Sequence, residues 1–364
     1  MRVLLLADRV FAAHERVLIE RIAVGLVAEG IDVHCALPAH RQGSGTPFTL
    51  ARQPVVYNDR GLAFTRRIRA AQIARQVVGD SKSVQDGMDM VHVFGGSAWG
   101  MGRELGDLFG CPVAYEVWRE GMVERAARVY LRNPNDSGFF APDTPIEQSL
   151  IGSGVGSATR LTHWGASVAQ STGELLAQGR DHTVVLVSSG RDRDRCIAAF
   201  EGLVSAIGSR EDVLIFVNTQ AAEQGGIWKR AKQLGVLEKL TVVQQMEDRR
   251  DLVLRCDLMV YPDQRHEHRT ILLDAMGHGL GVIAAHDDQV SVLINHETAL
   301  LVESATSEQW GQRISELLDN PDDARRLGRS ARLYIQQHRR TGVHAVSLVD
   351  AYSWMTESGS LAVR

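Results

Sequence analysis

The segment from residue 250 to residue 303 constrains the fold more than any other part of this sequence. It alternates short apolar runs with one amphipathic stretch, and we expect a strand, a helix, a strand and a short strand at Leu258 to Tyr261, Thr270 to Gly277, Gly281 to Ala285 and Ala299 to Val302. This alternation is typical of a parallel sheet covered by helices. Because ligands of such sheets bind beyond the carboxyl ends of the strands, the loop after the first strand is the first place to look for a site.

That loop is unusually dense in ionisable side chains. It contains Asp263, Arg265, His266, Glu267, His268 and Arg269. A loop of this composition at a strand end points to binding or catalysis.

The length and charge of the chain bound its class. At 364 residues it exceeds the usual size of one domain, so we predict two α/β domains, at residues 1–180 and 181–340. The net charge of -4 gives no reason to expect a nucleic-acid partner.

The cysteines and the apolar segments give no sign of a disulfide-rich, zinc-binding or membrane-spanning protein. The four cysteines are scattered without CxxC spacing, so neither a metal knuckle nor a disulfide framework is predicted. No apolar segment is long enough to span a bilayer, and no signal peptide precedes the first strand. We therefore expect a cytoplasmic protein.

The amino-terminal part reads as a βαβ unit. We expect a strand at Arg2 to Ala7, a helix at Ala13 to Glu29 and a strand at Ile31 to Leu37. The first turn, residues 8–14, contains no glycine, although a dinucleotide-type site would place one there. Residues 61–79 form a basic amphipathic segment, which is either a solvated helix face or a surface that attracts an anionic acceptor or a membrane.

The middle of the chain is less regular. Residues 132–160 are rich in Gly, Pro and Ser, so most of this stretch is predicted to be loop. A strand at Thr183 to Val187 would open the second domain. His92 lies in the apolar run of residues 89–96 and is either structural or placed at the edge of a cleft.

The string from Leu272 to Ala284, LLDAMGHGLGVIA, resembles the donor-site segment of family-4 retaining glycosyltransferases, whose usual form is close to LLEAMACGTPVVA. Residues 300–302 and 317–328 continue the likeness, and residues 161–178 resemble the strand and helix that close the first domain of that family. The resemblance implies a GT-B-like architecture, in which two Rossmann-like domains with parallel sheets, and with helices on both faces, face each other across a cleft. In this architecture residues 341–364 would form a helix that crosses back to the first domain. It further implies sugar transfer, with retention, from a nucleotide-sugar donor to a glycan or lipid-linked acceptor.

The resemblance also carries over site residues. In the family two glutamates separated by seven residues face the donor; the second falls on Asp274, and the first on His266, or on Glu267 if one residue is deleted. Glu116 ends a run that resembles the family's PVVYEVRG and would face the cleft. The implied catalytic residues are thus His266, Glu267 and Glu116. The implied donor-binding residues are Asp274, Arg191, Arg195, His268, Arg269 and Thr270.

Several roles stay open. Arg191 would neutralise the donor diphosphate, or else belong to an exposed charge run. Asp274 would accept hydrogen bonds from ribose hydroxyls, or else be an aspartate near the start of a helix that the helix dipole stabilises. No acidic pair with ligand spacing follows a strand, so we predict no metal and no cofactor other than the donor.

The family's glycines near the diphosphate are replaced. His268 and Arg269 stand in the first glycine turn, and Asp287 and Asp288 replace a later pair. Either side chains supply the missing donors, or the site has decayed, because two acids bring like charge toward a diphosphate. The alternative function is a noncatalytic member of a glycosyltransferase assembly that binds a partner enzyme or a glycan; an epimerase on the same fold ranks last. Peripheral contact with the inner face of a membrane is a further expectation, and the sequence does not determine the oligomeric state.

Overall fold

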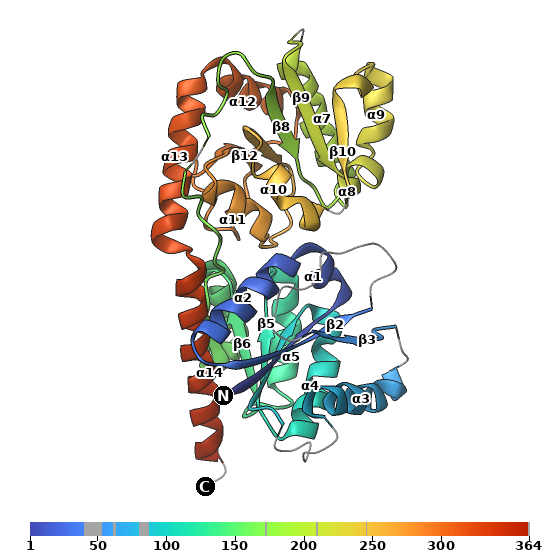
Figure 1. Ribbon diagram of the computed structural model, residues 1–364, viewed down its shortest axis with the longest axis vertical. Coiled ribbons are helices and arrows are strands. Elements are labelled where there is room, and N and C mark those ends of the chain that lie inside the picture. Colours follow the sequence, from blue (N-terminus) through green and yellow to red (C-terminus); the bar gives the residue numbers. More distant parts are fainter. Residues whose placement is uncertain are drawn as a thin grey trace. The chain divides into compact units, whose positions relative to one another are not determined.

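The chain folds into two compact units, which are shown in Figure 1. This computed structural model describes residues 1–39, 53–60, 63–79, 87–171, 173–208, 210–244 and 246–362. Unit 1 comprises Met1–Gly165, His266–His268 and Thr341–Arg364, and unit 2 comprises Ala166–Arg265 and Arg269–Arg340.

Unit 1 is built on a parallel sheet with the strand order β3-β2-β1-β4-β5-β6-β7 in the described part of the chain. Its strands are β1 (Arg2–Ala7), β2 (Asp32–Pro38), β3 (Val55–Tyr57), β4 (Met90–Phe94), β5 (Val113–Glu116), β6 (Ser137–Ala141) and β7 (Thr159–Leu161). The sequence runs β1, α2, β2 and then returns to the other side of β1 with β4, so the order reverses between β1 and β4.

Helices connect these strands and cover the sheet (Figure 1). They are α1 (Arg9–His14), α2 (Arg16–Ala28), α3 (Arg66–Val78), α4 (Trp99–Phe109), α5 (Val123–Tyr130), α6 (Thr144–Leu150) and the carboxy-terminal α14 (Thr341–Ala362). α14 packs on α2 so closely that a Cβ added to Gly25 would lie 2.7 Å from the Cβ of Ala345.

Unit 2 repeats the plan with the strand order β10-β9-β8-β11-β12-β13. The strands are β8 (His182–Leu186), β9 (Val213–Asn218), β10 (Leu240–Val243), β11 (Leu258–Tyr261), β12 (Gly281–Ala285) and β13 (Leu300–Val302). The helices are α7 (Arg193–Ile207), α8 (Thr219–Glu223), α9 (Ile227–Leu234), α10 (Arg250–Val253), α11 (Thr270–Gly277), α12 (Ser307–Asp319) and α13 (Pro321–His338). The apolar faces of these strands pack against Phe200, Leu203, Trp310 and Ile314 in the core.

The structure confirms the predicted α/β class with parallel sheets and reproduces the strands and helix expected in residues 250–303. The strands β1, β11 and β12 match the predicted bounds because each is a continuous apolar run that is buried on both faces. The expected helix at residues 13–29 begins earlier, as α1, and breaks at Glu15, where α2 starts.

Two predictions of secondary structure are wrong. Residues 132–160 are not mostly loop, because they contain β6, α6 and β7. Gly138 in β6 is required by packing, since a Cβ there would lie 2.5 Å from the sulfur of Met355 in α14.

The second wrong prediction is the helix expected within residues 161–178. The described residues between β7 and β8 contain no helix. The N–H of Ala169 donates to the carbonyl of Gly277, and the carbonyl of Ala169 accepts from Arg332 Nε at 3.1 Å. Backbone groups committed to α11 and α13 in this way cannot form a helix of their own.

None of the helices that the structure describes has both the length and the apolar character needed to cross a membrane.

Candidate functional site

The strand order of unit 2 marks one place for a ligand. The chain leaves β8 toward β9 on one side and returns to β11 on the other, so the loops after β8 and β11 diverge at the carboxyl edge of the sheet. Crevices at such reversal points bind ligands in open α/β sheets. The first of these loops contains Ser188, Ser189 and Gly190, and the second begins at Asp263.

Asp263 joins the two loops. Its Oδ1 accepts from Ser188 Oγ at 2.6 Å, and its Oδ2 accepts from the backbone N–H of Ser189 at 2.7 Å. The carboxylate is buried, and these bonds to it keep the turn after β8 in one conformation.

A second clamp comes from β9. Asn218 accepts from the N–H of Ser188 at 3.0 Å and donates from Nδ2 to the Ser188 carbonyl at 2.7 Å. The turn closes at Gly190, whose φ is +69° and where a Cβ would lie 2.3 Å from the carbonyl oxygen of Gln220. Only glycine fits this position without strain.

The arginines predicted to bind phosphate follow this turn. Arg191 is exposed, and Asp192 caps α7 by accepting from the N–H of Arg195 at 3.1 Å. Arg195 Nε also lies 3.1 Å from Asp192 Oδ2, so its charge is partly neutralised within α7. The amino end of α7 contributes a partial positive charge beside Arg191.

The structure places Asp274 and Thr270 together with a residue that the sequence did not indicate. Arg250, in α10, donates from Nη1 to Asp274 Oδ2 at 2.6 Å and from Nη2 to Thr270 Oγ1 at 2.8 Å. Asp274 and Thr270 have no exposed surface, and Arg250 is 6% exposed. The expectation that the Asp274 carboxylate faces a cleft is therefore wrong in this structure, because an ion pair buries it.

Arg269, also predicted to bind the donor, is the residue that precedes α11. It is buried and its side chain makes no capping hydrogen bond to the helix. Three predicted site residues thus lie in one short segment, Arg269, Thr270 and Asp274, but two of them are committed to Arg250.

The other predicted residues of this loop belong to unit 1. Glu267 Oε1 lies 3.1 Å from Arg119 Nη1, and the N–H of His268 donates to the Trp118 carbonyl at 3.0 Å. His268 Nδ1 lies 3.7 Å from Asp143 Oδ2. His266 has a φ of +53°, an uncommon conformation for a residue with a side chain.

Glu116 ends β5 but does not face a cleft, so that expectation is wrong. Its side chain is fully buried, where Oε1 accepts from Trp164 Nε1 at 2.6 Å and Oε2 lies 3.1 Å from His92 Nε2. His92 Nδ1 lies 2.7 Å from the hydroxyl of Tyr352 in α14. Burial raises the pKa of Glu116 to about 8 and lowers the pKa of His92 to about 3.

This network identifies His92 as a buried member of a hydrogen-bonded chain, one of the two roles that the sequence left open. Both groups are neutral near pH 7, so the interior of unit 1 contains no net charge here. Such a network fixes the packing of α14 on β4 and β5 rather than contacting a ligand.

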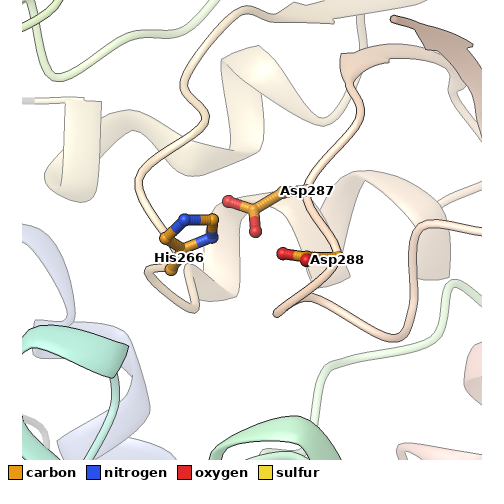
Figure 2. Close-up of side chains that lie close together, drawn as sticks. All are labelled: His266, Asp287 and Asp288. Atoms are coloured by element: carbon orange, nitrogen blue, oxygen red, sulfur yellow. The ribbon is translucent and has the colours of Figure 1, made fainter.

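The acidic pair that replaces the family's glycines lies after β12. Figure 2 labels Asp287 and Asp288 on this loop, and His266 on the loop after β11. Asp287 is buried and its Oδ1 accepts from the N–H of Gln289 at 3.1 Å, whereas Asp288 is exposed.

Sequence reasoning placed Asp263 in the candidate loop but gave it no role, and it missed Asn218 and Arg250 as organising residues. The signal for Asp263 was its place directly after a predicted strand, at the switch of strand order. No local signal exists for Arg250, because its partners lie far along the chain.

A family of known proteins resembles most of unit 2. The model of the family described as "Glycosyl transferases group 1" matches residues 191–334. The match starts at the residue after Gly190 and ends within α13. Residues 191–334 are therefore similar to the domain that this family model describes. No curated protein sequence matches the chain.

Solved structures share the fold over nearly the whole chain. HepE of Anabaena, in complex with UDP and glucose, is 13% identical, with a TM-score of 0.74 over 97% of this chain and 99% of that chain. Sucrose-phosphate synthase of Thermosynechococcus elongatus is 16% identical, with a TM-score of 0.73 over 98% and 99%. A glycosyltransferase of Rickettsia africae ESF-5 is 13% identical, with a TM-score of 0.69 over 97% and 98%. At these identities the likeness shows the fold, which is the GT-B-like two-domain α/β fold.

Proposed function

We propose that the chain transfers a sugar from a nucleotide-sugar donor to a glycan or lipid-linked acceptor, with retention, as family-4 enzymes do. The observation that supports this most is the family match at residues 191–334, which begins at the turn that Asp263 and Asn218 hold in place. The donor would bind at the carboxyl edge of the unit 2 sheet, beyond β8 and β11.

The chemistry of the leaving group explains why this turn suits a donor. A nucleoside diphosphate gains negative charge as the glycosidic bond breaks, and fixed positive groups lower the energy of that state. Arg191 and the amino end of α7 supply such groups beside a turn that does not need to reorganise. Arg191 is thus proposed to contact the diphosphate.

A noncatalytic role is the second candidate, and two observations favour it. Asp288 places an exposed carboxylate where the family has glycine, which opposes an approaching diphosphate. Asp274 is buried against Arg250 rather than open to a ribose. In this alternative the chain binds a partner enzyme or a glycan and turns over no donor.

A nucleotide screen by thermal shift and calorimetry separates the candidates. UDP is tested first because HepE was solved with UDP, followed by GDP, ADP and TDP. A ligand at a hundredfold excess over its Kd stabilises the folded chain by about 2.7 kcal/mol. We expect at least one nucleoside diphosphate to do so. With the corresponding nucleotide-sugar and an acceptor, NMR of the anomeric proton should then show a product that keeps the anomeric configuration of the donor. No response to any of them at millimolar concentration would support the noncatalytic role.

A further inference from the structure

Unit 1 contains a pocket that the proposed donor site does not use. It has a volume of about 520 Å³ and is lined from three helices, α3, α4 and α5, which Figure 1 labels. Its most frequent lining residue is arginine. The five arginines are Arg66, Arg103, Arg125, Arg128 and Arg132.

The carboxylates of the described residues do not balance these charges. Arg128 pairs with Glu124 at 3.7 Å, in an exposed contact of the kind that contributes little. The charge of Asp8 acts on Arg125, but the Asp8 carboxylate accepts from the N–H groups of Phe11 and Ser97. For the other four arginines no ion pair with a described carboxylate is found.

The arginines also repel one another. The pKa of Arg125 is lowered, first by burial and then by the charges of Arg128 and Arg66. A cluster of like charges that lowers the pKa of a member is stabilised by a bound anion.

Two buried aromatic side chains form part of the pocket wall. Trp99 and Tyr115 line it and are 2% and 1% exposed. The guanidinium carbon of Arg125 lies 5.1 Å from the ring centroid of Trp99, so the ring holds this cation in place. Trp99 Nε1 is buried and has no hydrogen-bond partner among the described residues. An unsatisfied buried donor is uncommon and leaves capacity for an acceptor atom.

We propose that this pocket binds the phosphate or diphosphate group of a small molecule. Guanidinium groups form paired hydrogen bonds to phosphate oxygens, and several of them match a multiply charged oxyanion better than a single carboxylate. The volume lies in the range of small-molecule sites, which leaves room for the body of a phosphorylated molecule beside its phosphate. The proposal does not depend on the donor site, because the residues lie in unit 1.

Calorimetric titration of inorganic pyrophosphate into the full chain tests the proposal. If UDP binds, it is present at saturation so that the proposed donor site in unit 2 is occupied. If UDP does not bind, it is left out. We expect one equivalent of pyrophosphate to bind, and the double variant Arg103→Gln with Arg125→Gln to weaken binding by about tenfold or more. Arg67→Gln, an exposed arginine of α3 that does not line the pocket, is the matched control and should bind as the parent does.

Sedimentation with vesicles separates a soluble ligand from a lipid surface. The proposal predicts pyrophosphate binding whether or not phosphatidylglycerol vesicles also bind. No pyrophosphate binding, unchanged affinity in the double variant, or binding to the vesicles alone would each overturn it. Because both substituted arginines are exposed, circular dichroism should show both variants folded. A failed UDP titration would count against the proposed function and leave this result standing.

Discussion

The buried pair of Arg250 and Asp274 is the residue-scale feature that most changes the interpretation of the site. A carboxylate without exposed surface is stable only when its charge is matched, and Arg250 supplies the match at 2.6 Å. The ion pair gives the aspartate a structural role, and its contact with a ribose stays a prediction.

Removing Arg250 alone should lower the free energy of unfolding far more than removing Arg250 and Asp274 together. Arg250→Met removes the guanidinium that pairs with the buried Asp274 carboxylate, and we expect a loss of about 3–5 kcal/mol in the free energy of unfolding by urea. The double variant Arg250→Met with Asp274→Leu should recover most of this loss. Arg326→Gln, which removes only an exposed pair with Asp323, should change stability by less than about 1 kcal/mol. A loss for Arg250→Met as small as that of Arg326→Gln would contradict the structural role.

The buried network of unit 1 predicts a pH dependence of stability. Glu116 has a folded pKa of about 8 against an ordinary value of 4.5, so unfolding releases a proton between these values and stability falls as pH rises. His92 has a folded pKa of about 3 against 6.5, so its contribution rises with pH up to 6.5. The two effects cancel between pH 4.5 and 6.5, and from 6.5 to 8 only the fall from Glu116 remains.

Glu116→Gln isolates this effect, because the amide keeps the shape and still accepts from Trp164. Relative to the parent, the variant should gain about 1–2 kcal/mol of stability between pH 6.5 and 8, measured by urea unfolding at each pH. The control variant Glu303→Gln, at an exposed glutamate, should follow the parent. Parallel pH profiles for Glu116→Gln and the parent would show that Glu116 is already ionised in the fold.

At the residue scale the sequence identified which side chains carry charge but not which of them meet. Glu116 was expected at a cleft because it ends a strand, yet Trp164 and His92 close over it. The partners of Asp274 and Glu116 come from distant parts of the chain, so their burial follows only from the tertiary packing.

At the scale of elements, the turn after β8 is the feature on which the proposed donor site depends. Gly190 and Gly235 have nearly the same φ, +69° and +72°, but a Cβ at Gly190 would lie 2.3 Å from Gln220 O, whereas nothing lies within 4 Å at Gly235. Substituting each glycine by alanine therefore separates two costs. Both positions carry the cost of a positive φ, and only Gly190 adds a steric contact.

Gly190→Ala should cost more stability than Gly235→Ala. The conformational cost of about 1 kcal/mol is common to both, and the contact with Gln220 O should add about 1–3 kcal/mol at Gly190. Urea unfolding gives the difference, and calorimetry should show UDP affinity reduced only in Gly190→Ala. Equal losses in the two variants would mean that the turn tolerates displacement.

Elements were predicted well where the sequence signal was one apolar run and poorly where tertiary contacts decided. β1, β11 and β12 follow from their composition. β6 was missed because Ser137 and Gly138 are typical of loops, whereas here Gly138 admits the side chain of Met355. The helix expected within residues 161–178 was wrong because that backbone bonds to α11 and α13 instead.

At the scale of the whole molecule, the chain returns to unit 1 at its carboxyl end. Buried side chains of α14 complete the core of that unit, including Leu348, Tyr352 and Met355. The fold class could be predicted from apolar periodicity and the carboxy-terminal helix from the family resemblance, whereas the partners of α14 could not.

Truncation after Arg340 should therefore unfold unit 1 selectively. It removes the hydroxyl that pairs with His92 and the contact between Ala345 and Gly25. We expect amide hydrogen exchange to lose protection in β4 and β6 while β8 stays protected. A chain ending at Glu357 keeps these side chains and is the control. Unchanged protection of β4 in the shorter chain would contradict this role of α14.

The central claim is that the turn after β8 in unit 2 receives the diphosphate of a nucleotide-sugar donor. Calorimetric titration of UDP and of uridine, into the parent chain and into Arg191→Gln, tests it most directly. The account predicts that UDP binds more tightly than uridine, and that Arg191→Gln weakens UDP by about 1.5–3 kcal/mol while uridine is unaffected, because only the diphosphate meets the guanidinium. Equal affinity of UDP and uridine for the parent chain, or equal losses for both ligands in the variant, would contradict it.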